Sequence, residues 1–206
     1  ETKDFSLERT ITEISEVVIT GLSQSTEQKK NPAPVSVVPL EHLQQNSSTN
    51  IIDALSREPG VTQITTGSGI SKPVVRGLGF NRVVVINDGI RQEGQQWGDE
   101  HGIEIDEFSV NKVEILKGPA SLMYGSDAMG GVIHMISAPT LPRGTVRGHL
   151  LSNYQTNNGL IAGSGNLAGN LNGWVFDARY SRKAAHAYQN KYDGFVPGTK
   201  FNEESY

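Results

Sequence analysis

The feature that most constrains this chain is a pair of alternating apolar and polar segments joined by the dipeptide Asn172-Gly173. Asn-Gly is a strong signal for a two-residue turn between antiparallel strands, because both of its residues accept a positive φ. Across such a turn Leu171 and Trp174 lie on the same side, and the alternation on both strands continues one apolar face. That face comprises Ile161, Gly163, Gly165, Leu167, Gly169, Leu171, Trp174, Phe176, Ala178 and Tyr180. The sequence therefore predicts long antiparallel strands with one apolar face.

A third alternating segment begins at Val146, so three strands of about 10 to 12 residues are predicted, the length of a transmembrane barrel strand. Strands with an apolar outer face and a polar inner face are typical of outer-membrane β-barrels. An amphipathic sheet of a soluble sandwich alternates in the same way, so the pattern leaves both structures open. Three strands cannot close a barrel, and we expect any such barrel to be incomplete at Tyr206.

Residues 31–138 have a different pattern, in which short apolar runs alternate with glycine, proline and asparagine. The pattern predicts short helices at 51–55 and 120–124. Strands are expected at 35–38, 61–66, 73–76, 82–86, 113–116 and 132–136. Mixed elements of this kind form a compact α+β domain. Residues 1–30 are polar and aperiodic, and we expect a flexible N-terminal arm there.

The composition excludes several classes of function. The chain has 206 residues, no cysteine and a formal net charge of -4. The lack of cysteine excludes disulfides, thiolate metal sites and cysteine nucleophiles. An acidic chain lacks the basic surface that nucleic-acid binding needs. The sequence has no nucleophile elbow, spaced catalytic triad or nucleotide-binding loop, so we expect neither an enzyme nor a resident cofactor.

Three motifs in the middle region are highly specific when they are taken together. The segment Val113–Ser137, VEILKGPASLMYGSDAMGGVIHMIS, has the order strand, Gly-Pro helix, Tyr-Gly, Gly-Gly, strand. Arg76-Gly77-Leu78-Gly79 precedes the run RVVVINDGIR, and NIIDALSREPGV lies upstream of both. These motifs resemble the plug domain of TonB-dependent outer-membrane receptors. The resemblance implies an α+β plug domain at 31–138, followed at 139–206 by the first antiparallel strands of a truncated transmembrane β-barrel and an extracellular loop.

The resemblance also assigns structural roles within the plug. Its glycines suit turns with positive φ or close backbone packing. In this family the arginines beside the Gly-rich turn can pair with carboxylates of the barrel wall, which we would place outside residues 1–206. The residues with structural roles are Arg76, Gly77, Arg82, Gly118, Pro119, Tyr124, Gly125, Gly130 and Gly131.

The arm contains the segment EVVITG, which resembles the TonB box. Its residues are Glu16, Val17, Val18, Ile19, Thr20 and Gly21. Such a segment binds TonB by adding a strand to it, and the apolar β-branched residues suit that role. The alternative is that EVVI is the first buried strand of the plug. Residues 4–15, DFSLERTITEIS, resemble the end of a carboxypeptidase-regulatory-like module, which many Bacteroidetes-type receptors carry before the TonB box.

The stretch 97–106, WGDEHGIEID, carries the densest group of polar side chains. The family's apical plug loops face the extracellular vestibule and contact substrate. We expect Gln92, Gln95, Gln96 and Trp97 to contact substrate. Asp99, Glu100 and His101 are candidate ligands of a divalent metal, because carboxylates and imidazole at close spacing suit Zn²⁺ or iron. Two alternatives stay open: a solvated acidic loop, or a loop held to the barrel wall by salt bridges.

The resemblance implies TonB-dependent uptake of a scarce nutrient across a Gram-negative outer membrane, with the arm in the periplasm. The expected partners are TonB with its inner-membrane energising complex, outer-membrane lipid, and a small-molecule or metal substrate. A bound metal ion would be substrate rather than cofactor. A metal or metal chelate, such as a siderophore, haem or zinc, is the favoured cargo. The alternatives are a surface receptor that binds or signals without import, and an importer of cobalamin, peptide or glycan.

Overall fold

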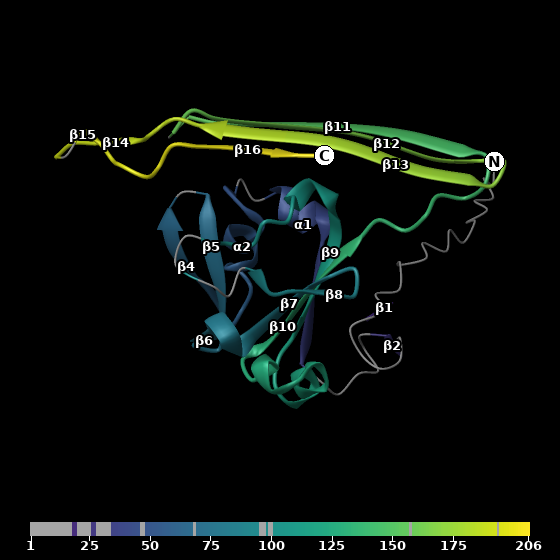
Figure 1. Cartoon of the computed structure of the whole chain (residues 1–206), viewed down its shortest axis with the longest axis horizontal. Helices are drawn as coiled ribbons and strands as arrows, with labels where there is room; N and C mark the ends of the chain where they lie inside the picture. The colour runs from purple at the N-terminus through teal and green to yellow at the C-terminus, as the bar shows by residue number, and fades with distance from the viewer. Residues whose placement is uncertain are drawn as a thin grey trace, which may run out of the picture.

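The computed structural model describes residues 18–19, 26–27, 34–45, 48–67, 69–94, 98, 101–156, 158–192 and 194–206. Within these ranges the chain forms two parts that pack on each other (Figure 1). The first, which we call the plug region, consists of the described residues from 34 to 137. The second, which we call the wall sheet, is the antiparallel sheet β11-β12-β13-β16. None of the helices in the described ranges is long and apolar enough to cross a membrane.

The plug region is built from short strands and short helices. Its strands are β3 (Val35–Pro39), β4 (Val61–Gly67), β5 (Ile70–Val75), β6 (Leu78–Gly79), β7 (Val83–Asn87), β8 (Ile90–Gln92), β9 (Val110–Leu116) and β10 (Gly131–Ser137). Its α-helices are α1 (Leu40–Gln45) and α2 (Ile51–Leu55), and its 3₁₀ helices are η2 (Phe80–Arg82), η4 (Glu107–Ser109), η5 (Pro119–Tyr124) and η6 (Ser126–Ala128). The wall sheet contains β11 (Thr145–Gln155), β12 (Leu160–Leu171), β13 (Trp174–Ala185) and β16 (Phe201–Ser205). Two small hairpins are formed by β1 (Val18–Ile19) with β2 (Thr26–Glu27), and by β14 (Gln189–Asn190) with β15 (Gly194–Phe195).

Five strands of the plug region form one mixed sheet in the order β3-β9-β10-β7-β8. Strand β10 is central, parallel to β7 and antiparallel to β9. On β7, Val83 and Val85 pack into the core that contains α2, whereas Val84 and Ile86 pack into a second core. A strand that is buried on both faces needs consecutive apolar residues, and this explains the unbroken run Val83–Ile86. The sheet therefore carries one apolar core on each face.

Most predicted elements of the plug region are confirmed, although β5 begins three residues before the strand predicted at 73–76 and β9 three residues before the strand predicted at 113–116. Helix α2 has the predicted bounds, and β4 and β10 extend the predicted strands by one residue at one or both ends. The helix predicted at 120–124 is the 3₁₀ helix η5, which Pro119 opens. Helix α1 was not predicted, because it is short and its only buried side chain among the described ones is Leu43.

The wall sheet has the register that the Asn-Gly turn predicts. Leu171 pairs directly with Trp174, and Asn172 and Gly173 have φ values of 51° and 89°. Strands β11 and β12 are paired over their whole common length, from Thr145–Asn170 to Gln155–Leu160. The sheet is open in the described chain, as predicted for barrel strands that do not close by themselves.

The two faces of the wall sheet have opposite surroundings. On the apolar face Leu150 is 83% exposed and Trp174 is 80% exposed. On the polar face Ser164 and Ser181 are buried where β12 and β13 cross the plug region (Figure 1). A soluble sandwich would bury the apolar face, so the structure favours the barrel arrangement, apolar outside and polar inside. The predicted fold class, an α+β plug domain followed by antiparallel barrel strands, is confirmed.

We expect Gly131→Ala to destabilise the plug region by about 3 kcal/mol or more, because a packed backbone cannot move away from the new side chain. Gly131 has a φ of 152°, and a Cβ there would lie 2.7 Å from the Leu116 carbonyl oxygen. The control is Gly94→Ala, because a Cβ at Gly94 meets open space. Chemical unfolding of both variants measures the difference, and equal losses of stability would contradict the assignment of Gly131 as a packing position.

Candidate functional site

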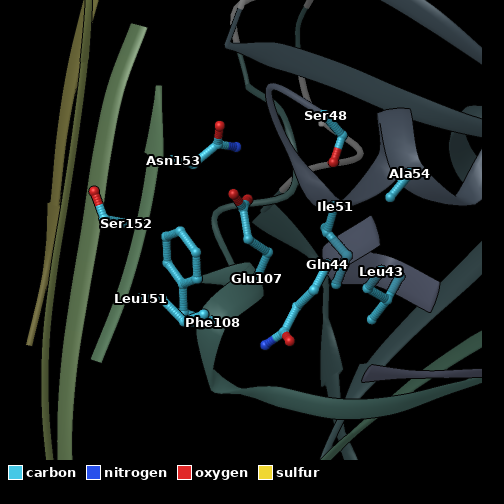
Figure 2. A pocket seen from close by; sticks show the side chains of 10 residues that line it. All are labelled: Leu43, Gln44, Ser48, Ile51, Ala54, Glu107, Phe108, Leu151, Ser152 and Asn153. Atoms are coloured by element: carbon cyan, nitrogen blue, oxygen red, sulfur yellow. The ribbon is translucent and has the colours of Figure 1, made fainter. Parts of the chain in front are cut away.

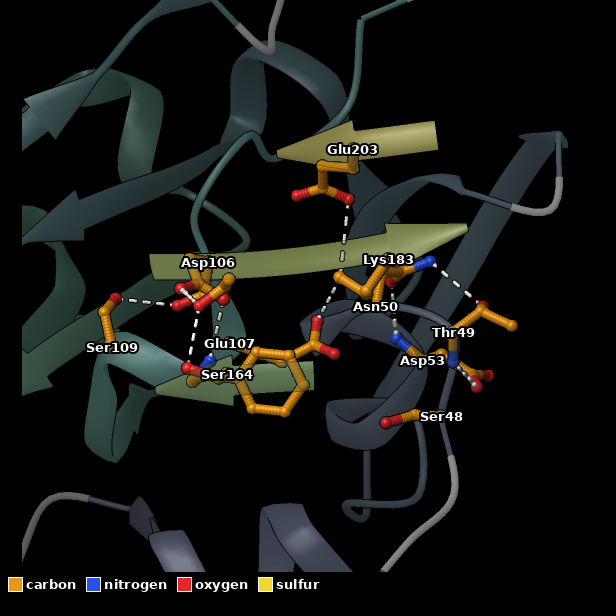
Figure 3. Close-up of polar contacts among 12 residues, drawn as sticks. Ser48, Thr49, Asn50, Asp53, Asp106, Glu107, Ser109, Ser164, Lys183 and Glu203 are labelled. Carbon is orange, nitrogen blue, oxygen red and sulfur yellow. Dashed lines mark hydrogen bonds and ion pairs between the residues drawn. The ribbon is translucent and has the colours of Figure 1, made fainter. Parts of the chain in front are cut away.

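The plug region contacts the wall sheet through the segment Asp106–Phe108 (Figure 3). Helix η4 shapes this segment, because the Asp106 carboxylate accepts a hydrogen bond from the Phe108 N–H at 3.0 Å. The same side chain accepts a 2.6 Å hydrogen bond from Ser181 Oγ of β13. Ser181 Oγ is also hydrogen-bonded to Ser164 Oγ of β12 at 2.8 Å. Asp106 therefore joins its own helix turn to two strands of the wall sheet.

An ion pair beside this contact is almost fully buried. Lys183 Nζ of β13 lies 2.7 Å from Glu107 Oε2 of the plug region and 3.4 Å from Glu203 Oε2 of β16 (Figure 3). The Lys183 side chain is 4% exposed and that of Glu107 is 17% exposed. Burial raises the pKa of the Glu107 carboxyl to about 7, and the Glu203 and Asp106 carboxylates also raise it, whereas Lys183 lowers it. Glu107 is therefore a carboxyl group that titrates near neutral pH.

A cavity of about 210 Å³ lies between the plug region and β11 (Figure 2). The Glu107 carboxylate points into it, beside Asn153 of β11 (Figure 2). Its lining combines apolar and polar side chains: Leu43, Gln44, Ser48, Ile51, Ala54, Glu107, Phe108, Leu151, Ser152 and Asn153. The volume holds several water molecules, and the polar lining can hydrogen-bond them. The cavity is therefore partly polar and has room for water.

Only part of the predicted substrate segment lies within the described residues. Gln92 ends β8, is half-buried, and donates a hydrogen bond to the Ile90 carbonyl at 3.3 Å. His101 is exposed, and its Nδ1 lies 3.6 Å from Glu104 Oε1. In the described part of the chain no group of three or more histidine and carboxylate side chains could hold a metal ion. Five predicted residues lie outside the described residues: Gln95, Gln96, Trp97, Asp99 and Glu100.

The TonB-box segment is described at two positions only. Val18 and Ile19 form β1, which pairs antiparallel with Glu27 and Thr26 of β2. Glu16, Val17, Thr20 and Gly21 lie outside the described residues, and so does the segment 4–15. Strand β1 thus pairs with β2 in a separate two-stranded sheet. It is not a strand of the five-stranded sheet of the plug region, in which β3 is an edge strand.

The residues predicted to have structural roles occupy tight turns and close backbone contacts of the plug region. Arg76 has a φ of 52°, and its N–H donates to the Gly60 carbonyl at 2.8 Å. A Cβ at Gly118 would lie 3.3 Å from the Arg76 guanidinium. The N–H of Gly130 donates to the Arg82 carbonyl at 2.7 Å. Gly77 and Gly125 have positive φ, Pro119 opens η5, and burial raises the pKa of Tyr124.

The observed ion pair between the two parts has the opposite polarity to the predicted one. We predicted plug arginines that pair with wall carboxylates, and no such pair of Arg76 or Arg82 occurs among the described residues. Lys183 instead places the cation on the wall sheet and the carboxylate on the plug region. Sequence reasoning missed this pair, although Lys183 stands on the predicted polar face of its strand. The predicted arginine pairs stay a prediction.

Residues 27–132, just over half of the chain, match the family model of the TonB-dependent Receptor Plug Domain. The chain therefore belongs to the TonB-dependent receptor plug family, which confirms the resemblance. Its Bacteroidetes-type origin stays a prediction.

Three relatives match part of the chain, and their names differ. The iron-regulated outer membrane virulence protein of Vibrio cholerae is 34% identical over 59% of this chain and 20% of its own length. The hemin receptor of Yersinia enterocolitica is 36% identical over 57% of this chain and 17% of its own length. The vitamin B12 transporter BtuB of Photobacterium profundum is 33% identical over 52% of this chain and 18% of its own length. The chain thus spans about a fifth of the length of these relatives.

A solved structure shares the fold. The hemophore receptor HasR of Serratia marcescens, a double mutant in complex with its hemophore HasA and heme, aligns with a TM-score of 0.72 and 23% identity. The alignment covers 84% of this chain and 28% of HasR. At this identity the likeness supports the fold of the plug region and the wall sheet.

We expect the protein to become less stable as the pH rises, because folding raises the pKa of Glu107. The ordinary pKa is 4.5 and the folded one is about 7, so the folded state binds this proton more tightly. Its stabilising effect is present below pH 4.5 and is lost as the pH rises through 7, by up to about 3 kcal/mol. Chemical unfolding at pH 5 and pH 8 measures it. Glu107→Gln should remove this dependence, whereas Glu104→Gln, at an exposed side chain, should keep it.

Proposed function

We propose that this chain forms the plug and first barrel strands of an outer-membrane receptor for TonB-dependent uptake of an iron chelate, such as a ferric siderophore or haem. The observation that carries the proposal is the polar face of the wall sheet, which is buried on the plug region while the apolar face is exposed. A domain seated on the lumen side of a barrel wall blocks passage and has to move for transport. The names of two relatives, iron-regulated protein and hemin receptor, support iron as the cargo.

The proposal gives each segment a role. The arm lies in the periplasm, and Glu16–Gly21 pairs with TonB, which is driven by its inner-membrane complex. The exposed apolar face, with Leu150 and Trp174, contacts outer-membrane lipid. Gln92, Gln95, Gln96 and Trp97 contact the chelate, and Asp99, Glu100 and His101 lie close enough in sequence to contact its metal. Residues 1–30, 31–138 and 139–206 are then the arm, the plug and the first barrel strands.

Cobalamin is the second candidate cargo, because the vitamin B12 transporter of Photobacterium profundum is as similar to this chain as the iron-related proteins are. A receptor that binds without import is a further alternative. Energised uptake separates this alternative from transport, because a binding receptor captures its ligand on the cell surface without accumulating it.

We expect deletion of Glu16–Gly21 to abolish energised uptake and to leave ligand binding unchanged, because the deletion removes only the strand that TonB would engage. The measurement compares cellular accumulation of labelled haem or ferric catecholate with its binding to de-energised cells. Deletion of residues 6–11, of equal length in the same arm, serves as the control. Undiminished uptake without Glu16–Gly21 would rule out the proposed mechanism.

We expect Trp97→Ala in the full-length protein to weaken binding of the iron chelate about tenfold or more, because a buried aromatic contact often dominates an interface. Elemental analysis tests whether the same segment binds free metal. Protein loaded with chelate should hold about one iron per chain, and protein given ferric salt alone should hold none. Iron bound from the salt and lost in the Asp99→Ala, His101→Ala double variant would instead define a direct metal site.

A further inference from the structure

Lys183 belongs to two ion pairs of different kinds. Its partner on β16, Glu203, is the directly opposed residue in the register of the wall sheet, so this pair exists within the wall sheet alone. Its partner Glu107 comes from the plug region, 76 residues away in the chain. The distances are 3.4 Å to Glu203 and 2.7 Å to Glu107. One cation is thus shared between a carboxylate that stays on the wall sheet and a carboxylate that belongs to the plug region.

The charges around Lys183 do not balance. Glu107, Glu203 and Asp106 are the carboxylates that act on this site, and Lys183 is the cation that faces them. Arg179, two residues before Ser181 on β13, donates to the Phe108 carbonyl rather than to a carboxylate. The Ser181 hydroxyl supplies the remaining wall contact, to Asp106. Glu107 and Glu203 therefore repel each other while they compete for the same ammonium group.

Breaking a buried ion pair is normally costly, because one charge is left buried without a partner. Here Lys183 would keep Glu203 when Glu107 leaves, so the wall cation is never unpaired. Glu107 would retreat into a cavity that already borders its carboxylate and has room for water (Figure 2). Lys183 therefore has a carboxylate partner before and after the movement, and Glu107 has either Lys183 or water. Separation of the pair then avoids most of the usual free-energy cost.

We propose that Lys183 is an exchange latch: it holds the plug region through Glu107 at rest and transfers fully to Glu203 when the plug region moves off the wall sheet. The latch deepens the proposed transport function and rests on it for its biological purpose. In this arrangement Glu203 has two effects. At rest it weakens the hold on Glu107 by sharing the cation, and during release it neutralises the cation that Glu107 abandons.

The test is hydrogen exchange of the backbone at 104–110 in the purified full-length protein at pH 8, without ligand. The Ser109 N–H reports directly, because it donates to the Asp106 carbonyl inside η4. Glu203→Gln should slow exchange about twofold or more, because the whole cation then serves Glu107.

Lys183→Met should speed exchange about fivefold or more, because Glu107 and Glu203 then face each other without a cation. Asp177→Asn is the matched control on the same polar face, because its hydrogen-bond partner Asn166 lies within the wall sheet, and it should leave exchange at 104–110 unchanged. A network of independent stabilising pairs predicts faster exchange in Glu203→Gln as well as in Lys183→Met. That result, or no change in Glu203→Gln, would overturn the latch.

The outcome is independent of the proposed cargo and of TonB, because exchange is measured without ligand or energy. Uptake gives a second readout: Glu203→Gln should lower energised uptake about threefold or more at unchanged ligand binding, because release leaves Lys183 unpaired. Slower exchange in Glu203→Gln together with normal uptake would overturn the proposed transfer of Lys183 to Glu203 during release. If deletion of Glu16–Gly21 leaves uptake unchanged while the exchange rates are as expected, the transport proposal is overturned. The resting contact between Lys183 and Glu107 then stands.

Discussion

The structure depends on the burial of a polar sheet face. The wall sheet exposes its apolar residues and turns Ser164, Ser181 and Lys183 inward, where each is at most 4% exposed. Buried hydroxyls and ammonium groups are unfavourable unless they find partners. The segment Asp106–Phe108 supplies one carboxylate to Ser181 and a second to Lys183, and Ser181 in turn is hydrogen-bonded to Ser164. The position of the plug region against the wall sheet therefore follows largely from the need to satisfy polar groups, together with a small apolar cluster in which Phe108 packs against Leu160, Ala162 and Ala185.

The core of the plug region differs from the contact between the plug region and the wall sheet. Inside the plug region, β7, β9 and β10 are packed on both faces by valine, isoleucine and leucine. Cavities in such a core are costly, so its parts do not separate easily. Between the plug region and the wall sheet, polar contacts lie beside a cavity, and the apolar cluster around Phe108 is small. Polar contacts can be exchanged for contacts with water at a small net cost. The plug region can accordingly leave the wall sheet while it keeps its own fold.

Sequence patterns predicted the features of the fold that depend on residues close together in the chain. The turn at Asn172-Gly173 set the register of β12 and β13, and the unbroken run Val83–Ile86 indicated a buried strand. Alternation separated the faces of the wall sheet, but it could not tell which face is buried, because that depends on the surroundings. The pair Glu107–Lys183 spans 76 residues and left no local pattern. The stretch 97–106 was predicted as one group from the chemistry of its side chains. In the structure Asp106 is hydrogen-bonded to Ser181 of the wall sheet, whereas His101 is exposed.

The polarity of the contact has a consequence for the segment that precedes it. Glu104, Asp106 and Glu107 place three carboxylates within four residues of the plug region. Ser181 and Lys183 of the wall sheet satisfy two of them, and His101 lies beside the third. Away from the wall sheet these carboxylates would repel one another, and the turn of η4 would lose the contacts that hold Asp106 in place. Contact with the wall sheet thus stabilises the local conformation of 104–109. Because His101 lies only three residues before Glu104, a change at the proposed substrate segment and a change at the wall contact would act on the same short stretch of backbone.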